Sequence, residues 1–189
     1  SYYVERGNRE RGKELLLKNH KLYPDDYSLL ATYIVALYQL QEWDNLEEAS
    51  TMALEQFPGD KDFTQLRGIA RFQTGKTEKA IESYRELEKI ALAGKDTATL
   101  ILAYTLLADL HYDKKESKTA FSYYNKVLKI NPNEVGALNN YAYYLALEGK
   151  NLKKAYQMSR KTIEAEPDNP TFLDTFGWIV YLQGRPMEA

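Results

Sequence analysis

Residues 101–134 read ILAYTLLADLHYDKKESKTAFSYYNKVLKINPNE, two apolar-rich segments joined by a short polar turn and closed by Pro132. In the first segment Tyr104, Leu107 and His111 recur with the spacing of one helix face. Proline cannot continue a helix, so Pro132 ends the second segment and sets the turn into the next one. Helical periodicity of this kind covers almost the whole chain, and no convincing alternating strand pattern occurs.

Prolines mark a regular period along the sequence. Pro24 and Pro58 are 34 residues apart, Pro132 and Pro167 are 35 apart, and the 74 residues between Pro58 and Pro132 are two periods plus six. The text around these prolines recurs as KLYPDD, EQFPGD, KINPNE and EAEPDN. Self-similarity at such a period indicates a helical repeat protein.

Glycines form a second set of marks between the prolines. The stretches QTGKTEKAIESY, ALEGKNLKKAYQ and LQGRPMEA each place a glycine before a short polar turn. We expect each glycine to supply the positive φ that ends the first helix of a pair. A small residue follows in the second helix and lets the two helices approach closely: Ala80, Ala120, Ala155 and Ala189.

This pattern resembles the tetratricopeptide repeat (TPR), a helix–turn–helix of 34 residues. The cleanest copy is 101–134, in which Tyr104, Leu107, Ala108, His111, Ala120, Tyr124 and Pro132 occupy signature positions. The resemblance covers the whole chain and divides it into a partial repeat 1–26, repeat 27–60, repeat 61–100 with a six-residue insert, repeats 101–134 and 135–169, and a partial repeat 170–189. In the first partial repeat, Gly7 marks the turn and Gly12 the small position.

The resemblance implies an all-α fold, a right-handed α-solenoid of antiparallel helix pairs with about 11 helices. Both ends of the chain fall inside a repeat, and neither has a polar capping helix. We therefore expect a piece of a longer repeat protein. The extra residues before LILAYTLLADL predict a longer helix that is apolar on more than one side.

In this family the first helix of each pair lines a concave groove, and a few positions of that helix reach the ligand. Carried over residue by residue, those positions give the expected partner-binding set: Thr105, Asp109, Tyr112, Asn139, Tyr143, Asp174, Trp178 and Tyr181, with Tyr38, Gln65 and Phe72 from earlier repeats. Aromatic rings bury a large area at low entropic cost, and amides and carboxylates can bond a peptide backbone. The structural alternative is that the aromatic rings pack between repeats.

The ligand is expected to be a neutral or basic protein or peptide. TPR domains that bind acidic C-terminal tails use Lys and Asn at two of the groove positions, where this chain has Ala31 and Val35, or Thr105 and Asp109. Asp109 and Asp174 would repel a carboxylate tail. With 25 basic residues, 27 acidic residues and a net charge of -2, the sequence does not predict a nucleic-acid binder.

Nothing in the sequence indicates catalysis, a metal site or a cofactor. There is no cysteine, no phosphate-binding glycine loop, and His20 and His111 lie in different repeats. His111 stands where the helix-pair core is expected, which favours a structural role. No apolar run is long enough to span a membrane. Besides a binding scaffold, two alternatives stay open: a structural or oligomerisation segment that self-associates through open repeat ends, and a regulatory arm of an enzyme outside this piece.

The final region, residues 138–189, resembles the C-terminal repeats of bacterial cell-envelope TPR adaptors, in which LD-x-x-GW and Y-x-x-G recur. This resemblance implies a bacterial source. It also favours a periplasmic protein or a lipoprotein over a cytoplasmic one.

Overall fold

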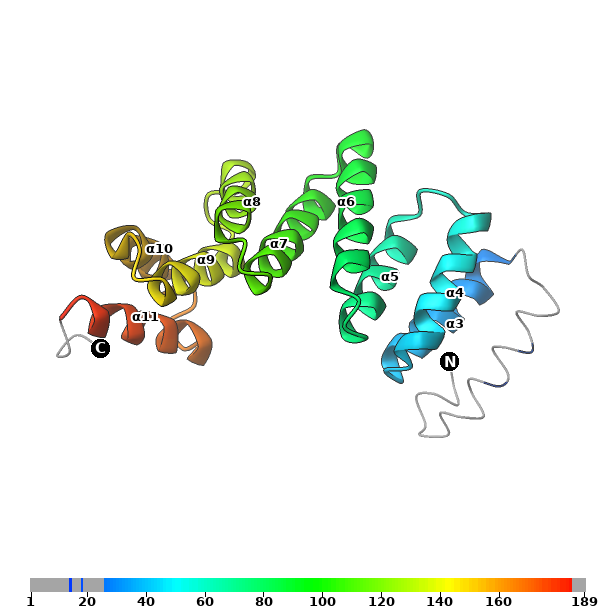
Figure 1. The fold of residues 1–189 in the computed structure, drawn as a ribbon, viewed down its shortest axis with the longest axis horizontal. Helices are drawn as coiled ribbons and strands as arrows, with labels where there is room; N and C mark the ends of the chain where they lie inside the picture. The colour runs from blue at the N-terminus through cyan, green and yellow to red at the C-terminus, as the bar shows by residue number, and fades with distance from the viewer. Residues whose placement is uncertain (1–13, 15–17, 19–25, 185–189) are drawn as a thin grey trace. The chain divides into compact units, whose positions relative to one another are not determined.

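The computed structural model describes residues 14, 18 and 26–184. Within 26–184 the chain is helical, without strands, as predicted for an all-α repeat fold. Nine helices occupy this range (Figure 1): α3 (Tyr27–Gln39), α4 (Trp43–Gln56), α5 (Lys61–Gln73), α6 (Thr77–Gly94), α7 (Thr97–Asp113), α8 (Ser117–Ile130), α9 (Val135–Leu147), α10 (Leu152–Ala165) and α11 (Pro170–Leu182). The expected partial repeat 1–26, with Gly7 and Gly12, and the expected small residue Ala189 lie outside the described residues, apart from 14, 18 and 26.

In three helix pairs, the first helix is capped at its N-terminus by a polar residue that lies two positions after one of the recurring prolines. Asp26 and Asp60 accept hydrogen bonds from the backbone amides of Leu29 and Phe63, and Asn169 accepts one from Thr171. Such side chains satisfy amides that have no partner inside the helix. The recurring Pro-x-Asp or Pro-x-Asn is therefore the start signal of these first helices.

The turn inside each helix pair requires a left-handed residue. Gly75, Gly149 and Gly184 have φ values of 74°, 61° and 75°, as the glycine marks predicted. Gln41 and Lys115 occupy the same place in their own helix pairs, with φ values of 58° and 65°. The turn geometry is thus kept where the sequence has no glycine, although a residue with a Cβ adopts it at a cost of about 1 kcal/mol.

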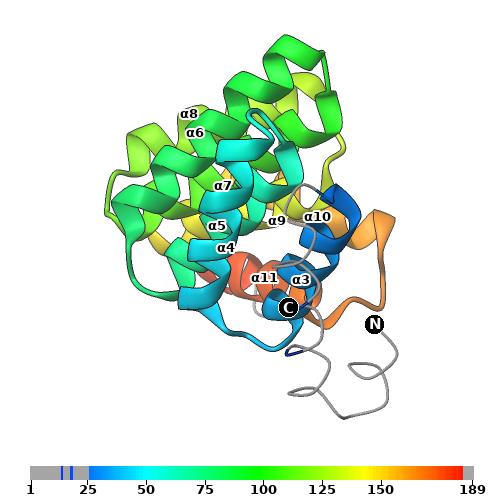
Figure 2. The same cartoon turned by 90° about the vertical axis from the view of Figure 1, so that its right-hand side faces the viewer.

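Contacts divide the chain into an N-terminal unit, residues 1–103, and a C-terminal unit, residues 104–189. In the N-terminal unit α4 packs on α3 and α5, and α5 packs on α6 (Figure 2). In the C-terminal unit α9 packs on α8, α10 and α11. Helix α7 crosses the boundary between the units. Among the described helices none is both long and apolar enough to cross a membrane.

The core of the N-terminal unit is mainly aliphatic. It contains residues that are almost fully buried and repeat every three or four positions, or every seven, along their helices: Leu30, Ile34 and Leu37, Leu46 and Ala53, Phe63 and Ala70. Gly68 of α5 lies against the buried ring of Tyr84, so that a Cβ at this position would stand 2.5 Å from Cε1. The small signature residue is needed here because the ring of α6 occupies the space of a side chain.

Two arginines of α5 stand at positions normally held by core residues, and the structure pairs both of them. Arg71 Nε lies 3.0 Å from Oε1 of Glu47, whose Oε2 lies 2.7 Å from Lys76 Nζ. Burial acts to raise the pKa of Glu47, but the hydrogen bonds from Lys76 and Arg71 outweigh it and lower that pKa. Arg67 Nη2 lies 2.5 Å from Oε2 of Glu86. These ion pairs give the arginines a structural role.

The C-terminal unit is held by small residues and tyrosines. Ala120 and Ala155, predicted to permit close helix approach, are both fully buried. The ring of Tyr124 is also fully buried, and it stacks on Tyr141 with ring centroids 5.3 Å apart. His111 is buried, its Nδ1 lies 2.5 Å from Oε2 of Glu116, and its ring stacks on Tyr123, as expected of a structural histidine.

Candidate functional site

Helix α11 presents an exposed pair of aromatic rings. Trp178 and Tyr181 stack with centroids 5.9 Å apart and an interplanar angle of 22°, and they are 42% and 60% exposed. Leu173, Asp174 and Gly177 complete an open hollow of about 480 Å³ around them. Spacings of three and four positions place these residues on one helix face. We call this face, with Tyr143 and Asn139 of α9, the aromatic face.

Helix α9, which packs against α11, adds one exposed ring and one buried amide. Tyr143 is 38% exposed, with its centroid 5.7 Å from that of Tyr144. Asn139 is buried, and its Nδ2 donates to Oδ1 of Asn140 at 3.4 Å. The Oδ1 atom of Asn139 has no hydrogen-bond partner among the described residues. A buried acceptor without a partner costs about 1–3 kcal/mol, and this atom is itself closed off from solvent.

Asp109 of α7 is held by donors from the next two helices. It accepts hydrogen bonds from the hydroxyl of Tyr124, from Nδ2 of Asn140 at 3.5 Å and from the hydroxyl of Tyr144 at 3.4 Å. Burial raises the pKa of Asp109 against the lowering effect of these hydrogen bonds. Burial and the carboxylate of Asp109 together raise the pKa of both tyrosines. Asp109 thus connects α7, α8 and α9, and this role was not foreseen from the sequence.

The other two candidates on α7 are also half-buried. The ring of Tyr112 stacks on Tyr144, with centroids 3.7 Å apart and an angle of 19°. Burial raises the pKa of its phenol, and the carboxylate of Glu148 raises it further. Thr105 lies one turn before Asp109 on the same helix. Tyr112 therefore supports Tyr144 by packing, as the structural alternative for the aromatic residues supposed.

The three remaining candidates belong to the N-terminal unit. Tyr38 of α3 is 42% exposed and meets Trp43 edge to face, with centroids 6.1 Å apart. Phe72 of α5 is 44% exposed, and Gln65 of the same helix is half-buried. The rings of Tyr38 and Phe72 are therefore exposed on the surface of the N-terminal unit.

Tyr144 and Asn140 are the residues that sequence reasoning missed. Tyr144 follows Asp109 by 35 residues, one repeat length, so a search for polar residues in register between adjacent repeats would have paired them. Asn140 follows the predicted Asn139 directly, and only the helix rotation tells which of the two amides faces Asp109.

The raised pKa of Asp109 predicts a pH-dependent stability. A carboxyl group with a higher pKa in the folded state stabilises the fold fully below its unfolded pKa, about 3.9, and this contribution is lost as the pH rises through the folded pKa. Asp109→Asn lacks this titration. We expect urea unfolding to show the variant gaining stability relative to the wild type between about pH 3 and pH 7.

Asp168→Asn, which removes an exposed carboxylate of the same unit that does not contribute to the raised pKa of Asp109, is the control for this titration. A difference between wild type and Asp109→Asn that is constant over the same pH range would refute the prediction.

Comparison with known proteins bears on the class of this chain. A family model described as tetratricopeptide repeat matches residues 101–134. A curated relative, the uncharacterized protein ycf37 of Pyropia yezoensis, is 30% identical over 92 residues, which are 49% of this chain and 49% of that protein. The chain therefore matches about half the length of this relative.

Solved structures show the same fold over nearly the whole chain. A tetratricopeptide repeat protein from Parabacteroides merdae superposes with a TM-score of 0.78 at 17% identity, covering 98% of this chain and 71% of that one. YrrB, described as a TPR protein with an unusual peptide-binding site, has a TM-score of 0.64 at 16% identity, covering 93% of this chain and 95% of its own.

Antiparallel helix pairs with proline-marked junctions and close-packed alanines define a helical-repeat protein of the α-solenoid class. Residues 101–134 match the tetratricopeptide repeat, and the structural neighbours show that the chain has the tetratricopeptide-repeat fold.

Proposed function

We propose that this chain is a non-catalytic scaffold that binds a segment of another protein on the aromatic face. Tetratricopeptide-repeat proteins act as protein-interaction scaffolds, and YrrB is described as having a peptide-binding site. The first helices α9 and α11 pack together, so Tyr143 and the Trp178–Tyr181 pair belong to one packed element of the C-terminal unit.

The observation that carries this proposal is the exposure of the stacked pair Trp178–Tyr181. The side chains of Ile179 and Val180, on the other side of the same helix, are fully buried, so α11 is firmly packed and still leaves two large rings in solvent. Clustered exposed apolar area of this kind marks interaction sites. Rigid tryptophan and tyrosine rings are the side chains most often found at binding hot spots.

The ligand that suits the aromatic face is a neutral or basic peptide. Asp174 is exposed beside the ring pair and supplies a negative charge that favours basic residues. Asp109 contributes less than the sequence suggested, because three donors from its own chain already bind it.

The setting of this function is also a proposal. The resemblance of residues 138–189 to bacterial envelope adaptors supports a bacterial protein of the periplasm or a lipoprotein. We also propose the division into repeats and partial repeats given above. Two alternatives remain: a structural segment that self-associates through open repeat ends, and a regulatory segment of an enzyme.

Loss of ligand binding in Tyr143→Ala/Trp178→Ala tests the proposed function. A display library of random linear peptides, selected on the wild-type chain, supplies the ligands, and calorimetry measures their affinity. The double variant is expected to bind about tenfold or more weakly, because it removes two anchor rings. Circular dichroism should show unchanged helix content, since both rings are exposed.

Leu92→Ala is the control, because it removes an equally exposed apolar side chain from α6. Selected peptides that bind the double variant and Leu92→Ala as tightly as the wild type would contradict the proposed function.

A further inference from the structure

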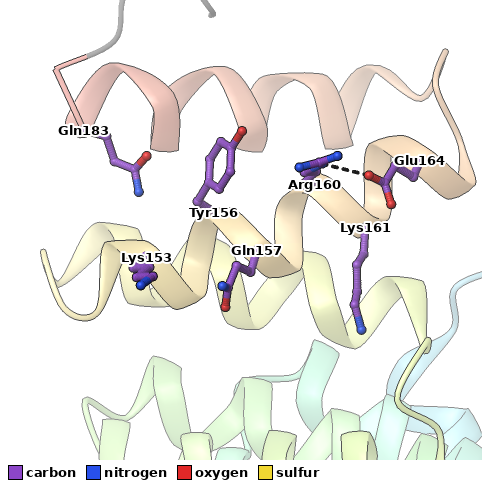
Figure 3. A pocket seen from close by; sticks show the side chains of 7 residues that line it. All are labelled: Lys153, Tyr156, Gln157, Arg160, Lys161, Glu164 and Gln183. Carbon is purple, nitrogen blue, oxygen red and sulfur yellow. Dashed lines mark hydrogen bonds and ion pairs between the residues drawn. The ribbon is translucent and has the colours of Figure 1, made fainter.

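Residues of α10 line a basic groove that the proposed function does not use. Figure 3 shows Tyr156 and Arg160 pointing from α10 toward α11, with Gln183 next to α11 reaching back toward them. Lys153 and Lys161 stand on the same groove, which has a volume of about 820 Å³. The groove is larger than the hollow of the aromatic face, and it is lined mainly by the second helix of a pair.

The charge of this groove is only partly neutralised within the chain. Arg160 Nε lies 2.8 Å from Oε1 of Glu164. No ion pair among the described residues involves Lys153 or Lys161. Three cations against one carboxylate leave the groove electropositive, so it suits an acidic surface of helical shape.

The chain itself offers such a surface on α4. This helix contains four acidic residues and no basic one. Glu48 and Glu55 are exposed on its outer side, and no ion pair involves either of them in the part of the chain that the structure describes. Met52, between them in the sequence, is 48% exposed although methionine is ordinarily a core residue.

The two helices match in spacing as well as in charge. Glu48 and Glu55 are seven residues apart, and so are Lys153 and Arg160, which makes both pairs about 10.5 Å apart along their helix axes. When the two helices lie side by side, parallel or antiparallel, each of the two carboxylates stands opposite one of the two cations. Met52 then lies between the two ion pairs, as Tyr156 lies between the two cations.

We infer that the α10 groove binds α4 of a second copy of this chain. Two ion pairs, each on the surface and screened by salt, flank a contact between the Met52 thioether and the Tyr156 ring. The two surfaces are different patches, so the contact is heterologous: in a pair, one copy keeps a free α4 and the other keeps a free α10 groove. Copies therefore add head to tail into short chains or a ring. This inference does not depend on the proposed function, because it uses neither Tyr143 nor Trp178.

Two variants, each inactivating one patch, test the inference. Glu48→Gln/Glu55→Gln removes the exposed carboxylates of α4, and Lys153→Gln/Arg160→Gln removes two of the cations of the groove. All four side chains are exposed, so neither double substitution should disturb the fold. Sedimentation equilibrium of the wild type at low salt, at about 0.1–1 mM protein, is expected to give a mass that rises above 21.8 kDa with concentration. About 0.5 M salt should return it to the monomer mass.

Each double variant alone is expected to stay monomeric. An equimolar mixture of the two should form a dimer and no larger species, because one intact groove meets one intact α4 and the remaining patches are neutral. A wild type that stays monomeric, association that salt does not weaken, or a mixture that contains no dimer would each overturn the inference. A mixture that assembles beyond the dimer would also overturn it.

Discussion

Tyr124→Ala is expected to lower the free energy of unfolding by about 3–5 kcal/mol, the largest effect of any single change considered for this chain. The ring is fully buried, and it lies between Tyr141 at 5.3 Å and Tyr144 at 6.1 Å, measured between centroids. Alanine would leave a cavity that these neighbours cannot fill without moving. It would also remove one of the three donors to Asp109, a buried acceptor.

Tyr124→Phe separates the ring from its hydroxyl. This variant keeps the stacking and loses only the hydrogen bond to Asp109, so we expect a cost of about 1–2 kcal/mol. Urea unfolding followed by circular dichroism measures both variants. If Tyr124→Ala cost no more than Tyr124→Phe, the ring would not hold the C-terminal unit together as the structure shows.

Gly68→Ala is expected to destabilise the N-terminal unit by about 1–3 kcal/mol. Alanine favours a helix over glycine by about 1 kcal/mol, so intrinsic propensity alone predicts the opposite sign. The clash decides the result, because the new Cβ would lie 2.5 Å from Cε1 and 2.8 Å from Cζ of Tyr84. That ring is itself buried and closely packed, so it cannot move aside freely.

Gly136→Ala is the matched control for Gly68→Ala. Gly136 lies in the first turn of α9, and a Cβ added there would meet no atom within 4 Å, so the same substitution should be neutral or slightly stabilising. Combining Gly68→Ala with Tyr84→Leu should remove most of the extra cost, because the clashing ring atoms are gone. Equal effects of Gly68→Ala and Gly136→Ala on unfolding would show that the close approach of α5 and α6 is wrong.

The elements of this fold are predictable from the sequence because their signals are local. Pro58 and Asp60 end one helix and start the next within three residues, and Gly75 supplies the left-handed turn that follows. The six extra residues 95–100 also act locally, and they lengthen the following helix to 17 residues, as predicted. Asp96 caps α7 by accepting from the amide of Thr99, so the helix starts at Thr97 and takes in most of the insert.

The candidate site is less predictable, because side-chain partners come from helices a repeat away. Family positions selected Trp178 and Tyr181, whose side chains are exposed, but they cannot show that Tyr112 is covered by Tyr144. They also assigned Asp109 to the ligand, whereas the structure gives it partners on α8 and α9. Whether a groove position is free depends on which rings fill the adjacent repeat, and periodicity carries no information about that.

Fluorescence of Trp178 on peptide addition tests the central claim most directly. The chain has two tryptophans, so Trp43→Phe leaves Trp178, on the aromatic face, as the single tryptophan emitter. A selected peptide should shift its emission to shorter wavelength with the same affinity that calorimetry measures, because binding removes water from the ring. Calorimetric binding that leaves the Trp178 spectrum unchanged would place the ligand elsewhere and contradict the account.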